Sequence, residues 1–223
     1  FYYHTLDSIT KRPNEKYYRF KSSDSFNLEV ARNMYLRTDY QDSIPKIIKD
    51  SELLDKLKYR YSDFPYYILK KFMEEHYDRT LDQLVQSHFY ESLGASYTLY
   101  NPYHTISSKK IVPTEVDDYY RYQKVHGYVH DMGAAMQNGV GGHAGLFSNA
   151  NDLAKLMQMY LQKGYYGGDQ YFKPSTVDEF TSCQYCDEEN RRGIGFDKPV
   201  IDDSDGPTCG CVSLMSYGHT GFT

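Results

Sequence analysis

Residues 139–155 have the sequence GVGGHAGLFSNANDLAK and carry more information about the fold than any other part of the chain. Glycines surround His143 and precede Ser148, and the segment then continues into residues with helical spacing. A glycine-rich loop that leads into a helix is typical of an anion-binding turn. The segment lacks the lysine and hydroxyl pair of a P-loop and does not fit the dinucleotide fingerprint, so it does not predict a nucleotide site.

Composition excludes several classes of protein. The chain has 223 residues and a net charge of −5, with 25 Lys and Arg interspersed among 30 Asp and Glu, whereas a nucleic-acid-binding face needs a basic excess. No apolar run approaches the roughly 20 residues of a membrane-spanning helix. The 16% aromatic content argues against disorder. The length suits one domain with a substantial core.

Helical periodicity is clearest on both sides of the glycine-rich segment. After it, an apolar series recurs until Gly164: Leu153, Leu156, Met157, Tyr160 and Leu161. Before it, Thr80 and Gln83 match a capping box, and a second apolar series follows: Leu81, Leu84, Val85, His88 and Phe89. Asp63 is placed to cap a helix that begins at Phe64, with an apolar face of its own: Ile68, Leu69, Phe72, Met73 and His76. We expect these faces to pack in the core.

Weaker patterns complete the expected organisation. Apolar spacing predicts three further short helices, at Phe26–Arg37, Asp42–Leu57 and Pro174–Phe180. Prolines and glycines interrupt any long period between residues 95 and 148, and a long irregular stretch in a compact domain is usually functional. The final residues, SYGHTGFT, predict a strand that carries His219.

Two short motifs contain groups suited to chemistry. Tyr61 and Asp63 flank a serine just before a helix, where the positive end of the helix dipole favours a phenolate. In a chain with 25 tyrosines, such spacing more often describes an ordinary tyrosine beside a helix cap. His219 and Thr220 place an imidazole and a hydroxyl before Gly221, which lets a ligand approach the backbone. A single histidine in a strand is more often structural.

Four cysteines form two tight pairs, Cys183-x-x-Cys186 and Cys209-x-Cys211. Four thiolates in this arrangement suit a structural zinc ion, and disulfides between the two loops suit an exported protein equally well. Four free thiols are the third alternative. Disulfides within either pair are less favoured, because such small loops strain the bond.

The order of the motifs along the chain is more informative than any one of them. Tyr-Ser-Asp at residues 61–63, GGHAGLFSNANDLAK at 141–155 and His-Thr-Gly at 219–221 together resemble the serine β-lactamase-like family, which includes class C β-lactamases, D-alanyl-D-alanine carboxypeptidases and related esterases. The likeness covers roughly residues 55–160 and 190–223. It implies an α+β fold, of which residues 1–223 form a single, partial domain. The chain supplies mainly the helical part and a few short strands.

The resemblance also implies roles for the motif residues. Tyr61 corresponds to the tyrosine that activates the nucleophile or protonates the leaving group. Asp63 replaces the usual asparagine, and a carboxylate cannot donate the amide hydrogen bond to a substrate. His219, Thr220 and Gly221 match the substrate-binding His-Thr-Gly variant, in which a protonated imidazole contributes charge at the substrate carboxylate.

The nucleophile of this family belongs to a Ser-x-x-Lys motif at the start of a buried helix. The chain offers three literal matches, at Ser8–Lys11, Ser43–Lys46 and Ser107–Lys110. Their polar, proline-containing or irregular settings predict that all three are accidental. We therefore expect the true serine and lysine to lie before Phe1, and the chain to be an inactive interior piece of a longer protein.

The resemblance predicts a serine hydrolase that acts by acyl transfer on a peptide, ester or β-lactam-type substrate, without a catalytic cofactor. One alternative is a non-catalytic relative that binds cell-wall peptide or glycan. The other is a zinc-stabilised interaction module built on the cysteine pairs. The likeness to exported bacterial proteins, some fused to family 3 glycoside hydrolases, predicts a periplasmic or cell-surface location and a possible glycoside hydrolase partner domain.

Overall fold

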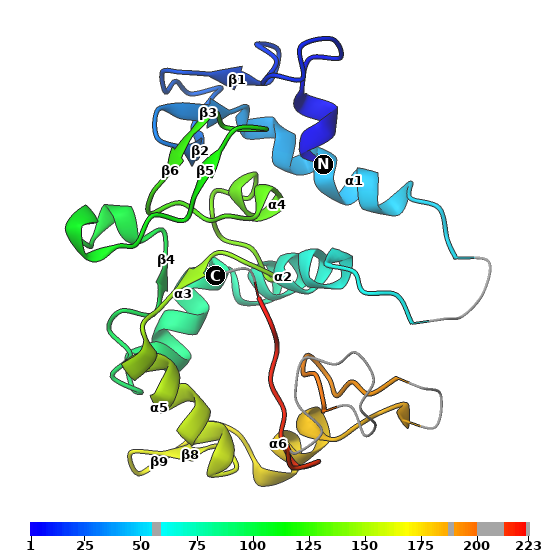
Figure 1. The fold of residues 1–223 in the computed structure, drawn as a ribbon, viewed down its shortest axis with the longest axis vertical. Helices are drawn as coiled ribbons and strands as arrows, with labels where there is room; N and C mark the ends of the chain where they lie inside the picture. Colours follow the sequence, from blue (N-terminus) through cyan, green and yellow to red (C-terminus); the bar gives the residue numbers. More distant parts are fainter. Residues whose placement is uncertain (55–58, 187–189, 200–211, 222–223) are drawn as a thin grey trace. The chain divides into compact units, whose positions relative to one another are not determined.

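The computed structural model describes residues 1–54, 59–186, 190–199 and 212–221 (Figure 1). The chain divides into two compact units, Phe1–Asn149 and Ala150–Thr223, which are described separately below. Helices and short strands are mixed in both units, as the predicted α+β class requires. That the two units form one domain stays a prediction.

The first unit contains a three-stranded antiparallel sheet in the order β1-β3-β2. Its strands are β1 (Tyr18–Arg19), β2 (Leu28–Ala31) and β3 (Met34–Leu36). The predicted helix at Phe26–Arg37 is therefore wrong. Burial in β2 alternates at Leu28, Glu29 and Val30, which is the period of a strand, and Asn33 turns the chain with a φ of 56°.

Two helices of the first unit begin close to their predicted positions. Helix α1 (Ser43–Lys49) follows the 3-10 turn η2 (Thr38–Asp42) and is shorter than the helix expected over residues 42–57. Pro45 is tolerated because the first turn of a helix needs no backbone donor there. Helix α2 (Phe64–Tyr77) begins at the predicted residue. Its C-cap is Asp78, whose backbone has the left-handed conformation.

The junction after α2 is stabilised differently from the expected capping box. Helix α3 (Leu81–Val85) follows, and the N–H of Leu81 donates to Glu74 Oε1 at 2.9 Å. Glu74 from α2, rather than the side chain of Thr80, thus caps α3. The next turn, η3 (Gln86–Tyr90), is π-helical, and it buries Tyr90 while His88 stays exposed.

Short elements fill residues 95–148, where no long element was predicted. Strands β4 (Leu99–Tyr100) and β7 (Leu146–Phe147) form one antiparallel pair, and β5 (Glu115–Asp117) and β6 (Gln123–Val125) form another. The remaining elements are a short helix and three 3-10 turns of the first unit: α4 (Met132–Ala135), η1 (Tyr2–Thr5), η4 (Pro102–His104) and η5 (Ser108–Lys110). In Figure 1 the β5–β6 pair lies beside β2 and β3, and Gln123 Nε2 donates to the Arg32 carbonyl at 3.3 Å.

The core of the first unit joins the sheet to α1, α2 and α4. It consists of Tyr18, Leu28, Val30, Ala31, Met34, Leu36, Tyr40, Ile44, Tyr67, Tyr120, Val129, Ala134, Ala135 and Met136. A fully buried guanidinium lies beside it. Arg121 donates to Asp117 Oδ2 at 2.7 Å, to Glu115 Oε1 at 2.7 Å and to the carbonyls of Val129 and His130 at 2.6 and 2.8 Å. Arg121 thereby ties the β5–β6 hairpin to the segment that leads into α4.

The second unit begins with α5 (Ala150–Leu161), which is followed by the hairpin strands β8 (Tyr165–Tyr166) and β9 (Asp169–Gln170) and by α6 (Pro174–Thr181). The helices predicted before Gly164 and from Pro174 are confirmed.

The predicted packing of the apolar helix faces is wrong for much of α2 and α5, whereas on α3 the predicted residue Leu84 is 4% exposed. Leu153 and Leu161 of α5 are 43% and 68% exposed, while Met159 is the buried apolar residue. On α2, Phe72 is 58% exposed and Tyr67 is buried instead. Apolar periodicity identifies a helix, but burial also requires a neighbouring element to cover that face. None of the helices within the described ranges combines the length and the apolarity that a membrane span needs.

Candidate active site

The Tyr-Ser-Asp turn directly precedes α2 in the first unit. Tyr61 is 58% exposed, so its phenol faces solvent rather than the core. Ser62 Oγ accepts the N–H of Phe64 at 3.2 Å, and the Asp63 carbonyl accepts the N–H of Tyr66 at 3.0 Å. The serine hydroxyl, not the predicted Asp63 side chain, thus satisfies a backbone donor at this helix start. The Asp63 carboxylate is not consumed in capping the helix.

One turn further along α2, a buried cluster joins three distant segments of the first unit. His143 Nε2 lies 2.8 Å from Asp131 Oδ1 and 3.4 Å from the Tyr67 hydroxyl. The rings of Tyr67 and His143 stack with centroids 4.6 Å apart. Gly133 leaves room for the hydroxyl, since a Cβ atom there would lie 1.9 Å from it. The cluster therefore fixes the side chain of Tyr67 against the loop that carries His143.

Charge in this cluster is well compensated. Burial favours a raised pKa for Asp131, but hydrogen bonds from His143 and from the N–H of Ala134 outweigh it and hold that pKa below its usual value. Burial, together with the negative charges of Asp131 and Asp63, raises the pKa of Tyr67 far above its ordinary range. Tyr67 is therefore a neutral phenol, and Asp131 is an ionised partner of the imidazole.

The sequence drew attention to His143 but not to its partners. Asp131 and Tyr67 lie 12 and 76 positions away in the chain, so no local spacing connects them. The one available signal was Gly133, because a glycine within a helical turn often marks the close approach of another group.

The His-Thr-Gly motif belongs to the second unit. It borders a cavity of about 170 Å³ that Lys198, Ser216, His219 and Thr220 help to line. The predicted strand is wrong for the part of the chain that the structure describes. A single bridge joins Gly218 to Asp197, and His219 follows it outside any strand.

Positive groups gather beside this cavity. Arg192 Nη1 lies 3.4 Å from His219 Nε2, and Arg192 Nη2 lies 2.9 Å from Asp197 Oδ1. Burial, and secondarily the charge of Lys163, lowers the pKa of Lys198. Arg192 is a permanent cation that sequence reasoning did not assign to the site.

The first cysteine pair is a disulfide. Cys183 and Cys186 are joined with their Cα atoms 5.8 Å apart, inside the normal range for such bonds. The expectation that a disulfide within a pair is disfavoured is therefore wrong here, because a two-residue spacer already permits the required approach. The bond engages two of the sulfurs that a four-thiolate zinc site requires. Cys209 and Cys211 lie outside the described residues.

The three Ser-x-x-Lys matches have different settings. Ser8–Lys11 is an exposed turn whose N–H groups donate to Asp7, and Ser107 precedes the short turn η5. Ser43 is the first residue of α1, so Ser43 and Lys46 lie one helical turn apart despite Pro45. Lys46 is exposed, and Ile44 is the buried residue of α1, whereas the family motif is expected to begin a buried helix. Within the described ranges, no three His, Cys, Asp or Glu residues are grouped as metal ligands.

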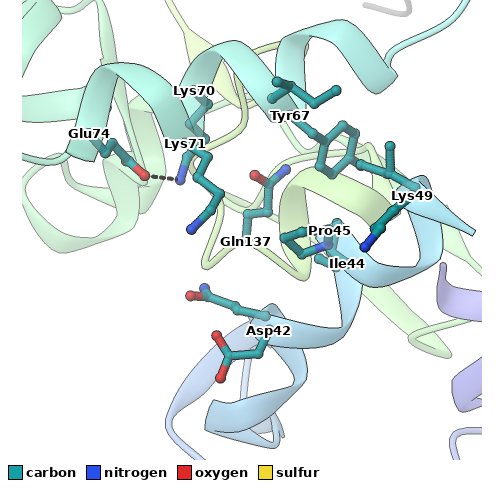
Figure 2. Close-up of a pocket in the computed structure, with 12 residues that line it drawn as sticks. Asp42, Ile44, Pro45, Lys49, Tyr67, Lys70, Lys71, Glu74 and Gln137 are labelled. Carbon is teal, nitrogen blue, oxygen red and sulfur yellow. Dashed lines mark hydrogen bonds and ion pairs between the residues drawn. The ribbon is translucent and has the colours of Figure 1, made fainter. Parts of the chain in front are cut away.

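A larger cavity of about 410 Å³ lies between α1 and α2, wholly within the first unit (Figure 2). Apolar side chains from both helices line it, together with lysines and the carboxamide of Gln137. On α2, the first residue that lines this cavity is Tyr67, which lies about one helical turn after Tyr61-Ser62-Asp63.

Comparisons with known proteins identify the family. The Beta-lactamase family model matches residues 23–223. A protein named "Putative D-alanyl-D-alanine carboxypeptidase" in Escherichia coli K12 is 36% identical over 179 residues, which cover 74% of this chain and 41% of that protein. Its namesake in Salmonella gallinarum is 35% identical over 185 residues, covering 77% and 42%. The chain thus spans about two fifths of these relatives.

A solved structure supports the fold. The octameric penicillin-binding protein homologue from Pyrococcus abyssi superimposes with a TM-score of 0.50 at 16% identity, over 70% of this chain and 33% of that one. Such low identity speaks to the fold alone. The family match, which extends over most of the chain, and the relatives at 36% identity confirm the family that the sequence resembles. The chain belongs to the β-lactamase family.

Proposed function

We propose that this chain supplies the acid–base turn and the substrate-binding segment of a serine hydrolase that works by acyl transfer. The observation that carries the proposal is the Tyr61-Ser62-Asp63 turn, which presents an exposed phenol at the start of α2 in a chain matched by the family over residues 23–223. An active-site tyrosine has to reach the reacting atoms, and a buried one, such as Tyr67, could not.

In the proposed reaction, a serine hydroxyl attacks the carbonyl carbon of the substrate. Tyr61 in its phenolate form takes the serine proton, and the phenol that results donates this proton to the leaving group as its bond to carbon breaks. Water then attacks the acyl-serine ester, which releases the acid and restores the hydroxyl. The exposure of the Tyr61 phenol leaves it accessible to a substrate.

Asp63 narrows the range of substrates. A carboxylate accepts hydrogen bonds but cannot donate one, so Asp63 cannot bind a substrate amide carbonyl as asparagine does. It can pair with a lysine ammonium. We therefore favour a substrate that does not depend on that amide contact, such as an ester, over a β-lactam.

The second unit is proposed to bind the anionic end of the substrate. Lys198 and Arg192 bring positive charge to the edge of the 170 Å³ cavity, where Asp197 pairs with Arg192, and His219, Thr220 and Ser216 offer hydrogen-bonding groups. These groups suit a carboxylate. Cell-wall peptides end in one, and we propose a periplasmic or cell-surface protein acting on an ester that carries such a terminal carboxylate.

The chain alone is proposed to form no acyl-enzyme. Intact-mass spectrometry after exposure to a fluorophosphonate, and separately to a penicillin, tests this directly. We expect no adduct with either reagent. A stoichiometric adduct mapped to Ser8, Ser43 or Ser107 would place a nucleophile within the chain and refute the proposed inactivity, with Ser43 the most informative because it begins a helix.

Binding can be tested without turnover. We expect a peptide ending in D-alanyl-D-alanine to shift the NMR signals of His219 and Thr220, and His219→Asn to weaken binding severalfold. His104→Asn, a histidine of the first unit, is the matched control. An affinity for the peptide that is unchanged by His219→Asn would refute the proposal that this segment binds the substrate carboxylate. A non-catalytic binding relative would show the same shifts, but it would form no adduct even in the full-length protein.

A further inference from the structure

The cavity between α1 and α2 has no role in the proposed reaction. We propose that it is a binding site for a small carboxylate with an apolar body. Its volume of about 410 Å³ lies within the usual range for small-molecule sites. All its lining residues belong to the first unit, so the site does not depend on how the two units are arranged.

Apolar side chains form much of the cavity wall. Ile44 contributes from α1 and Tyr67 from α2 (Figure 2). Ile48 and Ile68 also line the cavity from these two helices. Ile44 and Tyr67 are only 3% and 8% exposed, because both also belong to the core of the first unit. These two walls are therefore held in place before any ligand arrives, which reduces the entropy lost on binding.

Ammonium groups from both helices are available to the cavity. Lys49 lines it from α1, and among the described residues no ion pair engages Lys49. Lys71 lines it from α2 and pairs with Glu75 at 2.6 Å, but both side chains are more than half exposed. Water and salt screen such a pair, so it is readily exchanged for a ligand carboxylate.

The neighbouring Lys70 is already engaged in an ion pair within the protein. It donates to Glu74 at 2.7 Å, and both side chains are mostly buried. Since Glu74 also caps α3, this pair is part of the framework and not a recognition group. Lys49 and Lys71 are thus the cations that a ligand can recruit.

Neutral polar groups complete the site. The carboxamide of Gln137 is nearly buried and extends between α2 and α1, close to Lys71 (Figure 2). It can donate to one carboxylate oxygen while a lysine binds the other. Asp42 and Glu74 also line the cavity, so its net positive charge is small. A single carboxylate matches that charge better than a phosphate ester, and an apolar body matches the walls.

The test uses 4-phenylbutyrate as the probe and 4-phenylbutanol, which has no charge, as its matched partner. Titrations of the isotopically labelled chain, followed by NMR, should shift the amides of Ile48, Ile68 and Gln137. We expect the acid to bind about two- to fivefold more tightly than the alcohol, as expected for partly exposed ion pairs. Lys49→Met combined with Lys71→Met should remove that difference, whereas Lys46→Met on the exposed side of α1 should not.

A second pair of variants tests the position of the site. Ile68→Trp fills the cavity and should weaken both probes at least tenfold. Leu69→Trp is the control, because Leu69 is similarly exposed on α2 and does not line the cavity. Equal binding of acid and alcohol would overturn the proposal, as would shifts that survive Ile68→Trp or a titration that leaves these amides unmoved. None of these readouts requires a nucleophile, so they are independent of the proposed hydrolase function.

Discussion

Replacing Arg121 should be among the most damaging single changes in the first unit. Its side chain is fully buried, and its guanidinium satisfies two carboxylates and two backbone carbonyls. Arg121→Met would leave Asp117, also fully buried, without its cation. Removing one partner of a buried ion pair costs about 3–5 kcal/mol of unfolding free energy. For a urea dependence of about 2 kcal/mol per M, the unfolding midpoint should fall by about 1.5–2.5 M.

Urea unfolding followed by circular dichroism measures this loss. Arg37→Met is the matched control, because Arg37 pairs with Asp39 at the surface, and such a pair contributes at most about 1 kcal/mol. Adding Asp117→Asn to Arg121→Met should recover part of the loss, since the carboxylate charge disappears while an oxygen still accepts the N–H of Tyr120. If Arg121→Met costs no more than Arg37→Met, the guanidinium does not hold this hairpin.

Three further outcomes follow from the described contacts. Gly133→Ala directs a methyl group at the Tyr67 hydroxyl and should lower the unfolding free energy by about 1–3 kcal/mol in the same urea assay; an unchanged midpoint would contradict the close approach. Because the folded-state pKa of Asp131 lies below its ordinary 3.8, its stabilisation should be complete above about pH 5 and fade as acid protonates the carboxylate. The midpoint difference from Asp131→Asn should therefore shrink between pH 6 and about pH 3, and a difference independent of pH would refute this. Mild reduction followed by alkylation should label Cys183 and Cys186 together, and labelling of both without a reductant would show that they are thiols.

Local signals were sufficient for several helices. Asp63 and Pro65 placed the start of α2 at the correct residue, since both favour a helix N-terminus whatever surrounds it. Pro174 did the same for α6. The hairpin at residues 28–36 was misread because its apolar residues fit helical and strand periods equally well. The backbone turn at Asn33, which distinguishes them, has no strong sequence signature.

Non-local contacts were beyond local reasoning. The Tyr-Ser-Asp and His-Thr-Gly motifs were found by their order along the chain, but His143 gained partners that only folding brings together. The burial of Tyr67 in place of its apolar neighbours depends on the same contacts. Likewise, a carboxylate on α2 replaced the expected capping box, because Glu74 lies near the first turn of α3 only after the chain has reversed.

The π-helical turn at Gln86–Tyr90 has an evolutionary consequence. A π turn corresponds to one residue inserted into an α-helix. One inserted residue rotates the part of the helix that follows it by about 100°. The side chain that faces the core is then Tyr90, and not the one that uninterrupted α-helical spacing would place there. Relatives that keep an ordinary α-helix here should be one residue shorter in this interval, with an apolar residue aligned to Tyr90.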